Sequence, residues 1–201
     1  MSSVWPVRLA EGRVGLRPLR SRDRGRWMEL RRNNLEWLKQ WEATVPEVSG
    51  EAPPSFFSMV RRLHREARDR QSMPLVITYD DEVVGQLTVG GMAWGSLRSC
   101  FIGYWIDHDH AGRDITPTAV AMIVDYLFER AHLHRVEINI RPENTASRRV
   151  VEKLGFRVEG LRERYLHIDG DWRDHLTYVL TAEEVPDGIL RRWMEHRSST
   201  T

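Results

Sequence analysis

Residues 110–120, HAGRDITPTAV, combine residue types that bind anions. Gly112 and Arg113 suggest a backbone pocket in a short loop. Thr116 and Pro117 fit the N-cap and the first position of a helix, where proline loses no hydrogen bond because that N–H is free in any helix. Free N–H groups and the positive end of the helix dipole would then face a ligand, an arrangement best suited to phosphate. The alternative is a plain strand-to-helix turn.

Asp114 places a negative charge inside this loop. Aspartate is one of the few residues other than glycine that tolerate the left-handed conformation, so the backbone path of a phosphate loop can survive it. We expect its carboxylate to point away from a bound phosphate, toward Arg113, because repulsion would otherwise weaken binding. A mononucleotide P-loop is excluded, since the chain has no G-x-x-x-x-G-K-[ST] motif.

A second motif lies one predicted helix and one predicted strand later, in RPENTASRRVVEKLGF at 141–156. Asn144 and Ser147 open a short helix, and Gly155 followed by Phe156 is a well-formed helix stop. The two motifs together resemble those of the Gcn5-related N-acetyltransferases, in which N-x-x-S opens a helix ending in G-F. In the pyrophosphate loop of that family, R/Q-x-x-G-x-G/A, glycine usually stands where this chain has Asp114.

Further segments narrow the resemblance. LKQWE, IGYWID and above all YLHIDGDWRDH look like the RimJ/RimL branch, the N-terminal acetyltransferases of ribosomal proteins, with the RimJ type the nearer. The similarity covers roughly residues 13–182. It implies acetyl-CoA as the cofactor and direct attack of a free amine on the thioester. The implied acceptor is a protein N-terminus of the alanine or serine type.

The resemblance also implies roles for individual residues. Ser147 matches the hydroxyl that protonates the leaving thiolate as general acid, although a first-turn serine that merely bonds the backbone is the alternative. Asn144 matches the asparagine that binds the pantetheine, and the N–H near Ile106 would stabilise the oxyanion. The implied cofactor-binding residues are Tyr104, Ile106, Asp107, His108, Ala111, Gly112, Arg113, Asp114, Ile115, Thr116, Asn144 and Ser147.

The general base is less defined. An α-amino group has a pKa of ~8 and is roughly one-tenth neutral at pH 7, whereas a lysine at ~10.4 is almost fully charged, so an N-terminal acceptor demands less of a base. The strand position at which many relatives carry a glutamate falls near Cys100. The remaining candidates, acting through water, are Glu137, Glu42 and Glu163.

Aromatic, histidine and arginine patterns each have two interpretations. Trp37 and Trp41 could line the acceptor cleft or pack in the core. Paired histidines at 108/110 and 132/134 lack a third ligand, so we expect no metal. The arginines at 61, 62, 65, 68 and 70 could contact ribosomal RNA or an acidic partner, but a solvated helix face is the account that we favour.

Composition sets the broader limits. The chain has 201 residues, a formal net charge of +1 and one cysteine. It therefore has no intramolecular disulfide, no thiolate zinc cluster and no bulk field that favours DNA. It lacks a signal-peptide-like start and any apolar run of about 18 residues. We expect one cytoplasmic domain over 1–201, monomeric or dimeric, with a core at about 13–182 and a helical extension at 182–197.

Hydrophobic periodicity predicts the elements that position these motifs. Alternation predicts strands at 13–19, 74–79, 82–89, 99–107 and 135–140, and two more around Asp169-Gly170. The strand at 99–107 is mostly apolar, which predicts burial on both faces. Helical spacing predicts helices from Asp23, over 35–42, from 55, from Thr116, over 144–154 and at about 182–196, with a loop at 43–54.

This order predicts an α/β fold: a mixed, mostly antiparallel twisted sheet of about seven strands with helices on both faces. The resemblance adds splayed central strands. Three functions follow: an N-terminal acetyltransferase, an acetyltransferase for a small amine such as a polyamine or aminoglycoside, and a non-catalytic acyl-CoA-binding module.

Overall fold

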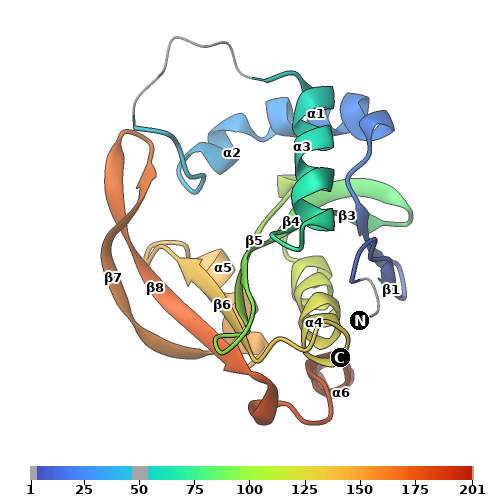
Figure 1. Ribbon diagram of the computed structural model, residues 1–201, viewed down its shortest axis with the longest axis vertical. Helices are drawn as coiled ribbons and strands as arrows, with labels where there is room; N and C mark the ends of the chain where they lie inside the picture. Colours follow the sequence, from blue (N-terminus) through green and yellow to red (C-terminus); the bar gives the residue numbers. More distant parts are fainter. Residues whose placement is uncertain (1–3, 47–53, 201) are drawn as a thin grey trace.

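A computed structural model describes residues 4–46 and 54–200, without the side chains of residues 199 and 200. Its centre is one sheet in the order β1-β2-β3-β4-β5-β6-β8-β7 (Figure 1). All neighbouring strands are antiparallel except β5 and β6. The predicted mixed, mostly antiparallel sheet is therefore confirmed. The described sheet has eight strands rather than about seven, because the three-residue β1 was too short to leave a periodic pattern.

The strands follow the predicted ranges closely elsewhere. Asp80 and Asp81 form the β3–β4 turn with positive φ, and Asp169 and Gly170 form the β7–β8 turn. The eight strands are β1 (Leu9–Glu11), β2 (Val14–Pro18), β3 (Met73–Tyr79), β4 (Glu82–Ala93), β5 (Ser99–Ile106), β6 (Arg135–Ile140), β7 (Arg157–Ile168) and β8 (Asp171–Thr181).

Helices cover both faces of this sheet, as predicted. The larger core lies between the sheet and α4, with Trp193 of α6 and Val151 of α5 on the same side. A smaller core on the other face joins Leu30 of α1, Val60 of α3 and Val76 of β3. The α-helices are α1 (Arg24–Asn33), α2 (Leu35–Lys39), α3 (Phe56–Arg68), α4 (Ile115–Glu129), α5 (Thr145–Lys153) and α6 (Ile189–Thr200). None of the described helices is long and apolar enough to cross a membrane.

The C-terminal helix begins later than predicted. A short 3₁₀ turn (Ala182–Glu184) follows β8, and α6 starts only at Ile189. Its start is set by Asp125 of α4, whose carboxylate accepts the backbone N–H groups of Ile189 and Leu190. A contact from a distant helix thus decides the boundary.

The two central strands diverge. β5 pairs with β6 only from Ser99 to Phe101, and the five residues beyond that point have no partner on this side. Phe101 and Gly103 are consequently exposed, so the prediction that this strand is buried on both faces was wrong. On one face of β5, Cys100 and Ile102 pack in the core. Several of its other residues line the cavities beside the strand instead of a second core.

The β7–β8 hairpin closes the other side of this opening. β8 pairs with β6, and in Figure 1 the turn end of the hairpin extends past β6 and reaches up to the segment that follows α2. Ala43 forms an isolated bridge with Ile168, and the N–H of Thr44 donates to the carbonyl of His167 at 2.8 Å. The gap between β5 and β6 is therefore framed by α2, α5 and the hairpin.

Candidate active site

The loop after β5 enters α4 differently from the prediction. The helix begins at Ile115 with Asp114 as its N-cap, not at Pro117 with Thr116 as its N-cap. Asp114 adopts φ 57° and ψ 14°, the left-handed conformation that aspartate tolerates. The first helical hydrogen bond runs from the N–H of Thr118 to the Asp114 carbonyl at 3.2 Å. Pro117 is still in the first turn, where its missing N–H costs nothing.

Five consecutive backbone N–H groups in this loop have no hydrogen-bond acceptor among the described residues. No N–H from Gly112 to Thr116 donates a hydrogen bond to a described residue. Gly112 and Asp114 both have positive φ, which curves the chain so that successive N–H groups converge. Together with the positive end of the α4 dipole, they form a site suited to a phosphate or pyrophosphate.

A cavity of about 470 Å³ opens directly above this loop. Its wall is formed by β5, the loop, the first turns of α5 and the aromatic side of α2. It is lined at the loop end by Ala111, Gly112, Asp114, Ile115 and Thr116, and elsewhere by Tyr104, Ile106, Asn144, Ser147, Arg149 and Lys153. Arg113, Asp107 and His108, which the sequence also suggested for the cofactor, do not line it.

The carboxylate of Asp114 points to the helices behind the loop. Lys153 at the end of α5 donates to it at 2.9 Å, and Arg197 of α6 lies 3.7 Å away. The prediction that it turns toward Arg113 was therefore wrong, because the partners are supplied by helices 39 and 83 residues later. These two cations offset the charge of the aspartate, which reduces its repulsion of an anion at the loop.

Asp114→Gly is expected to leave the affinity for coenzyme A equal or improved. Glycine keeps the positive φ at no steric cost, and the change frees Lys153, a cation on the cavity wall. The two lost ion pairs are partly exposed and stabilise little, about 0–1 kcal/mol each. Titration calorimetry with coenzyme A measures this. A loss of more than about tenfold would instead assign Asp114 a positive role in holding α5 and α6.

The free edge of β5 supplies further backbone donors. The N–H of Asp107 donates to Val84 of β4 at 2.8 Å, so by strand alternation the N–H groups of Tyr104 and Ile106 point toward the open side. Asn34 fixes the strand end: its amide nitrogen donates to the Asp107 carboxylate at 2.6 Å, and its oxygen accepts the N–H of His108 at 2.8 Å. The donors at Tyr104 and Ile106 are thereby held in place for a ligand lying along the strand.

Ser147 lies on the first turn of α5, at the inner end of the cavity. Its N–H is capped by the Asn144 side chain at 3.0 Å, and its Oγ lies 2.8 Å from the hydroxyl of Tyr104. No described backbone group accepts a bond from this Oγ, so it is not occupied by a helix carbonyl. Burial raises the pKa of Tyr104 well above its usual range, so the phenol stays protonated and can donate to Ser147. The serine proton is then left to point elsewhere.

A second cavity, of about 340 Å³, lies between the diverging strands and the β7–β8 hairpin. Trp41, Gly103, Tyr104, Asn144 and Ser147 line both cavities, so the two meet at the Tyr104–Ser147 pair. A long ligand in the first cavity and a second reactant in the other would therefore face each other across this hydroxyl. Sequence reasoning missed the other walls of this cavity, among them Asn139, Arg141, Tyr165 and His175.

Of the three carboxylates suggested as bases, two form ion pairs with arginines and the third lies away from both cavities. Glu42 lines the first cavity but forms an ion pair with Arg31. Glu137 lines neither cavity and is held by Arg135 at 2.9 Å and by Arg162 at 2.7 Å. Glu163 is exposed on β7 and also lies outside both cavities. Glu42 and Glu137 are therefore both bound to arginines rather than free beside a reactant.

Trp37 of α2 and Trp41, which follows this helix, both line cavities. Trp37 lines the first cavity and packs edge-on against His108 at 5.0 Å, and Trp41 lines both, with Arg141 over its ring at 5.4 Å. The described residues contain no group of three or more side chains that could hold a metal ion. Asp107 binds the ring of His110 at 2.8 Å instead.

Comparisons with known proteins agree with this geometry. Residues 13–157 match the family model of the acetyltransferase (GNAT) domain. The ribosomal protein uS5-alanine N-acetyltransferase of Escherichia coli K12 is 31% identical over 189 residues, covering 92% of this chain and 95% of that protein. Mycobacterium smegmatis RimJ, solved in complex with CoA-disulfide, is 41% identical with a TM-score of 0.91, covering 98% of this chain and 97% of that one.

A structure described as the ribosomal-protein-S5-alanine acetyltransferase of Vibrio fischeri shares the fold, with a TM-score of 0.78 at 22% identity over 88% of this chain and 97% of that one. The family model covers well over half of the chain, and the E. coli relative spans nearly all of it. The protein therefore belongs to the GNAT acetyltransferase family and is an N-acetyltransferase that uses acetyl-CoA.

Proposed function

We propose that residues 1–201 act as one domain that transfers the acetyl group of acetyl-CoA to the free N-terminal amine of a ribosomal protein beginning with alanine or serine. The observation that carries the acceptor class is the second cavity. None of its lining residues is acidic, whereas Arg141, Asn139 and Asn144 are present. A neutral α-amine with a peptide behind it fits such a wall, since amides and an arginine can bind backbone carbonyls.

The relatives support the same acceptor. The E. coli relative is named for an alanine of ribosomal protein uS5, and it covers almost the whole chain. Another E. coli relative, a ribosomal-protein-serine acetyltransferase, is 25% identical over 134 residues, which are 67% of this chain and 68% of that protein. A small first residue also suits a cavity of about 340 Å³ that is shared with the thioester.

The geometry supports a direct transfer. The pyrophosphate would lie on the N–H groups from Gly112 to Thr116, and the pantetheine along the free edge of β5 beside Tyr104 and Ile106. The thioester would reach Ser147, where the N–H of Ile106 stabilises the oxyanion. The neutral amine attacks from the second cavity, the C–N bond forms and the C–S bond breaks. The Ser147 hydroxyl protonates the leaving thiolate, and the proton that the nitrogen loses returns to Ser147 through solvent.

A polycationic small amine fits less well. It would require carboxylates near its charges, and the acceptor cavity has none among the described residues. Glu47 and Glu51, two acidic residues of the predicted loop at 43–54, lie outside the described residues. The non-catalytic alternative loses its main support, because Lys153 offsets the charge of Asp114.

A panel of acceptors tests this proposal. Thiol release from acetyl-CoA is followed with peptides that begin with alanine, serine or a bulky residue, with their N-acetylated forms, and with spermidine. We expect release with the alanine and serine peptides and none with the acetylated forms. Release with spermidine but with no peptide would overturn the proposal, and so would cofactor binding without release on any amine.

A ribosomal acceptor places the protein in the cytoplasm and near RNA. The outer face of α3 supports such a contact, since Arg61, Arg65 and Arg68 are exposed there, while Arg62 pairs with Glu66. Arg70, grouped with them by sequence, lies beyond the helix and stacks on Trp94. Contacts between arginine and phosphate weaken with salt, so acetylation of the ribosome-bound acceptor should fall more steeply with salt than that of the free peptide.

A further inference from the structure

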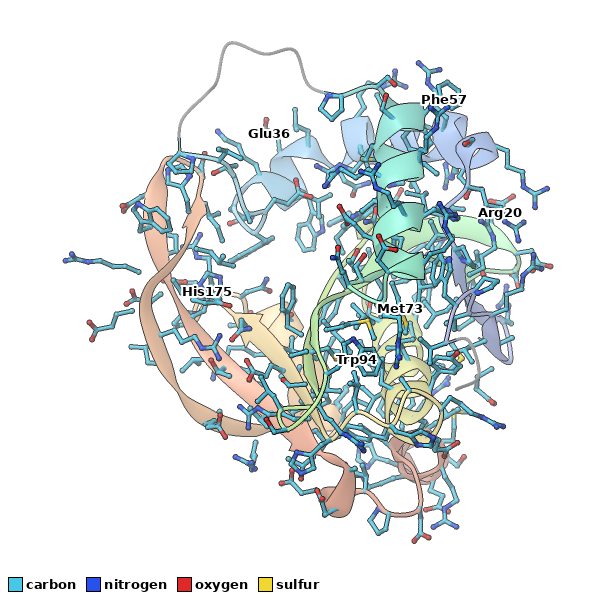
Figure 2. The ribbon with its side chains drawn as sticks, viewed as in Figure 1. Arg20, Glu36, Phe57, Met73, Trp94 and His175 are labelled. Atoms are coloured by element: carbon cyan, nitrogen blue, oxygen red, sulfur yellow. The ribbon has the colours of Figure 1, made fainter. Side chains whose placement is uncertain are left out.

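The block YLHIDGDWRDH was the most specific part of the sequence resemblance, yet no residue in it had a role. In the structure it forms the β7–β8 hairpin, and its last residue, His175, lines the acceptor cavity (Figure 2). The proposed reaction needs a group that takes a proton from the attacking nitrogen, and Glu42 and Glu137 are held by arginines. We propose that His175 is this base, acting through Nε2 on the amine in the second cavity.

The hydrogen bonding of His175 fixes its tautomer. Nδ1 lies 2.9 Å from the carbonyl oxygen of Arg173. A carbonyl oxygen only accepts, so Nδ1 carries the proton and the neutral ring has its lone pair on Nε2. Within the described residues Nε2 forms no hydrogen bond. Only 3% of the residue is exposed, and the ring packs edge-on against Tyr165 at 5.5 Å, so its orientation is constrained.

The surroundings keep this imidazole neutral. Burial lowers the pKa of His175 below its usual value of 6.5, although the Arg173 carbonyl raises it again in part. Among the charged neighbours, Arg141 lowers the pKa, and Asp174 and Glu143 raise it. Two groups of β7 face this ring. Arg162 is paired with His175 across the hairpin and is bound to Glu137, and Tyr165 packs against the imidazole. At pH 7 the ring is therefore a free base.

Two side chains, His175 and Ser147, account for the protons moved in this reaction. The neutral amine attacks the thioester carbon, and as the C–N bond forms Nε2 accepts the proton that this nitrogen loses. The C–S bond breaks and the Ser147 hydroxyl gives its proton to sulfur. The imidazolium proton then restores Ser147 through solvent. The products are the acetylated amine and the free thiol, and both side chains return to their starting forms.

The test compares His175→Gln with His134→Gln. The control histidine is exposed, pairs with Glu183 and lies outside both cavities. Both variants are assayed with acetyl-CoA and an alanine-initiated peptide, and coenzyme A binding is measured by calorimetry. We expect His175→Gln to lose about 100- to 10,000-fold in kcat, with coenzyme A binding unchanged, and His134→Gln to match the wild type.

The pH profile separates a base from a packing residue. Below the amine pKa, log kcat/KM of the wild type rises with a slope of about 1, and below the His175 pKa, under 6.5, the slope becomes about 2, since both groups must be neutral. His175→Gln should keep a slope of about 1 throughout. Retained kcat, or an unchanged acid limb, would overturn the assignment, as would an NMR tautomer with the proton on Nε2.

This inference rests on the proposed function, and the two can fail separately. The same profile is measured with glycinamide, a small amine with no peptide behind it. If glycinamide is acetylated and no peptide is, the proposed acceptor is wrong, and the His175 comparison is read from glycinamide. If peptides are acetylated and His175→Gln behaves as the wild type, only the base assignment falls. If no amine is acetylated, both are overturned.

Discussion

Ser147→Ala is expected to lower kcat by about 100- to 1,000-fold while leaving the KM for acetyl-CoA within a few-fold of the wild type. The hydroxyl lies where the two cavities meet and is bound by a protonated Tyr104 at 2.8 Å. When Tyr104 donates this bond, the serine proton can reach the departing sulfur. An interaction made only in the transition state lowers kcat and kcat/KM together.

Ser198→Ala is the matched control for this prediction. Ser198 is a helix serine whose hydroxyl donates to the Met194 carbonyl at 3.0 Å, which is the purely structural role that a first-turn serine could also play. Steady-state kinetics on both variants, with thermal unfolding as a check on folding, gives the comparison. A Ser147→Ala enzyme with kcat within about threefold of the wild type would remove Ser147 as the general acid.

Gly112→Val is expected to weaken coenzyme A binding by at least about 100-fold, or about 2.7 kcal/mol. Gly112 has φ +75°, and no protein atom lies within 4 Å of an added Cβ. The variant therefore meets no clash inside the protein. A β-branched residue strongly disfavours this φ, and relaxing to negative φ turns the neighbouring N–H groups away from the anion site.

Gly95→Val separates backbone strain from loss of the site. Gly95 also has φ +75° and open space around its Cβ, but it lies in the β4–β5 turn, outside both cavities. The two variants should lose similar unfolding free energy, of roughly 1–2 kcal/mol or somewhat more. Only Gly112→Val should lose affinity in calorimetry. Equal affinity in both would show that the loop N–H groups do not hold the cofactor.

Local sequence predicted most elements, because their signals are short-range. The stop at Gly155 before Phe156, the turn at Asp169-Gly170 and the amphipathic α3 all lie as the periodicity and turn chemistry indicated. The boundaries that failed were set from a distance. The start of α6 depends on Asp125 of α4, and the N-cap of α4, Asp114, is bound through its carboxylate by Lys153 of α5.

The family, the fold and the cofactor could be inferred from the sequence. The loop and the helix start are each a contiguous motif, so the residues that set their backbone conformation are adjacent in the chain. The pairing of each carboxylate with a cation could not be inferred in this way. Glu137 is bound by Arg162, on a strand 25 residues later, and local sequence does not report this contact. The divergence of β5 from β6 exposed Phe101 and opened the acceptor cavity, which no alternation pattern reports.

HAGRDITPTAV on its own predicted an anion site and raised one doubt, the charge of Asp114. The tertiary structure resolved that doubt through Lys153 and Arg197, and it joined Ser147 to Tyr104 and His175 around one opening. Backbone conformation is a local property that sequence encodes directly. The protonation and pairing of side chains depend on neighbours that only folding brings together.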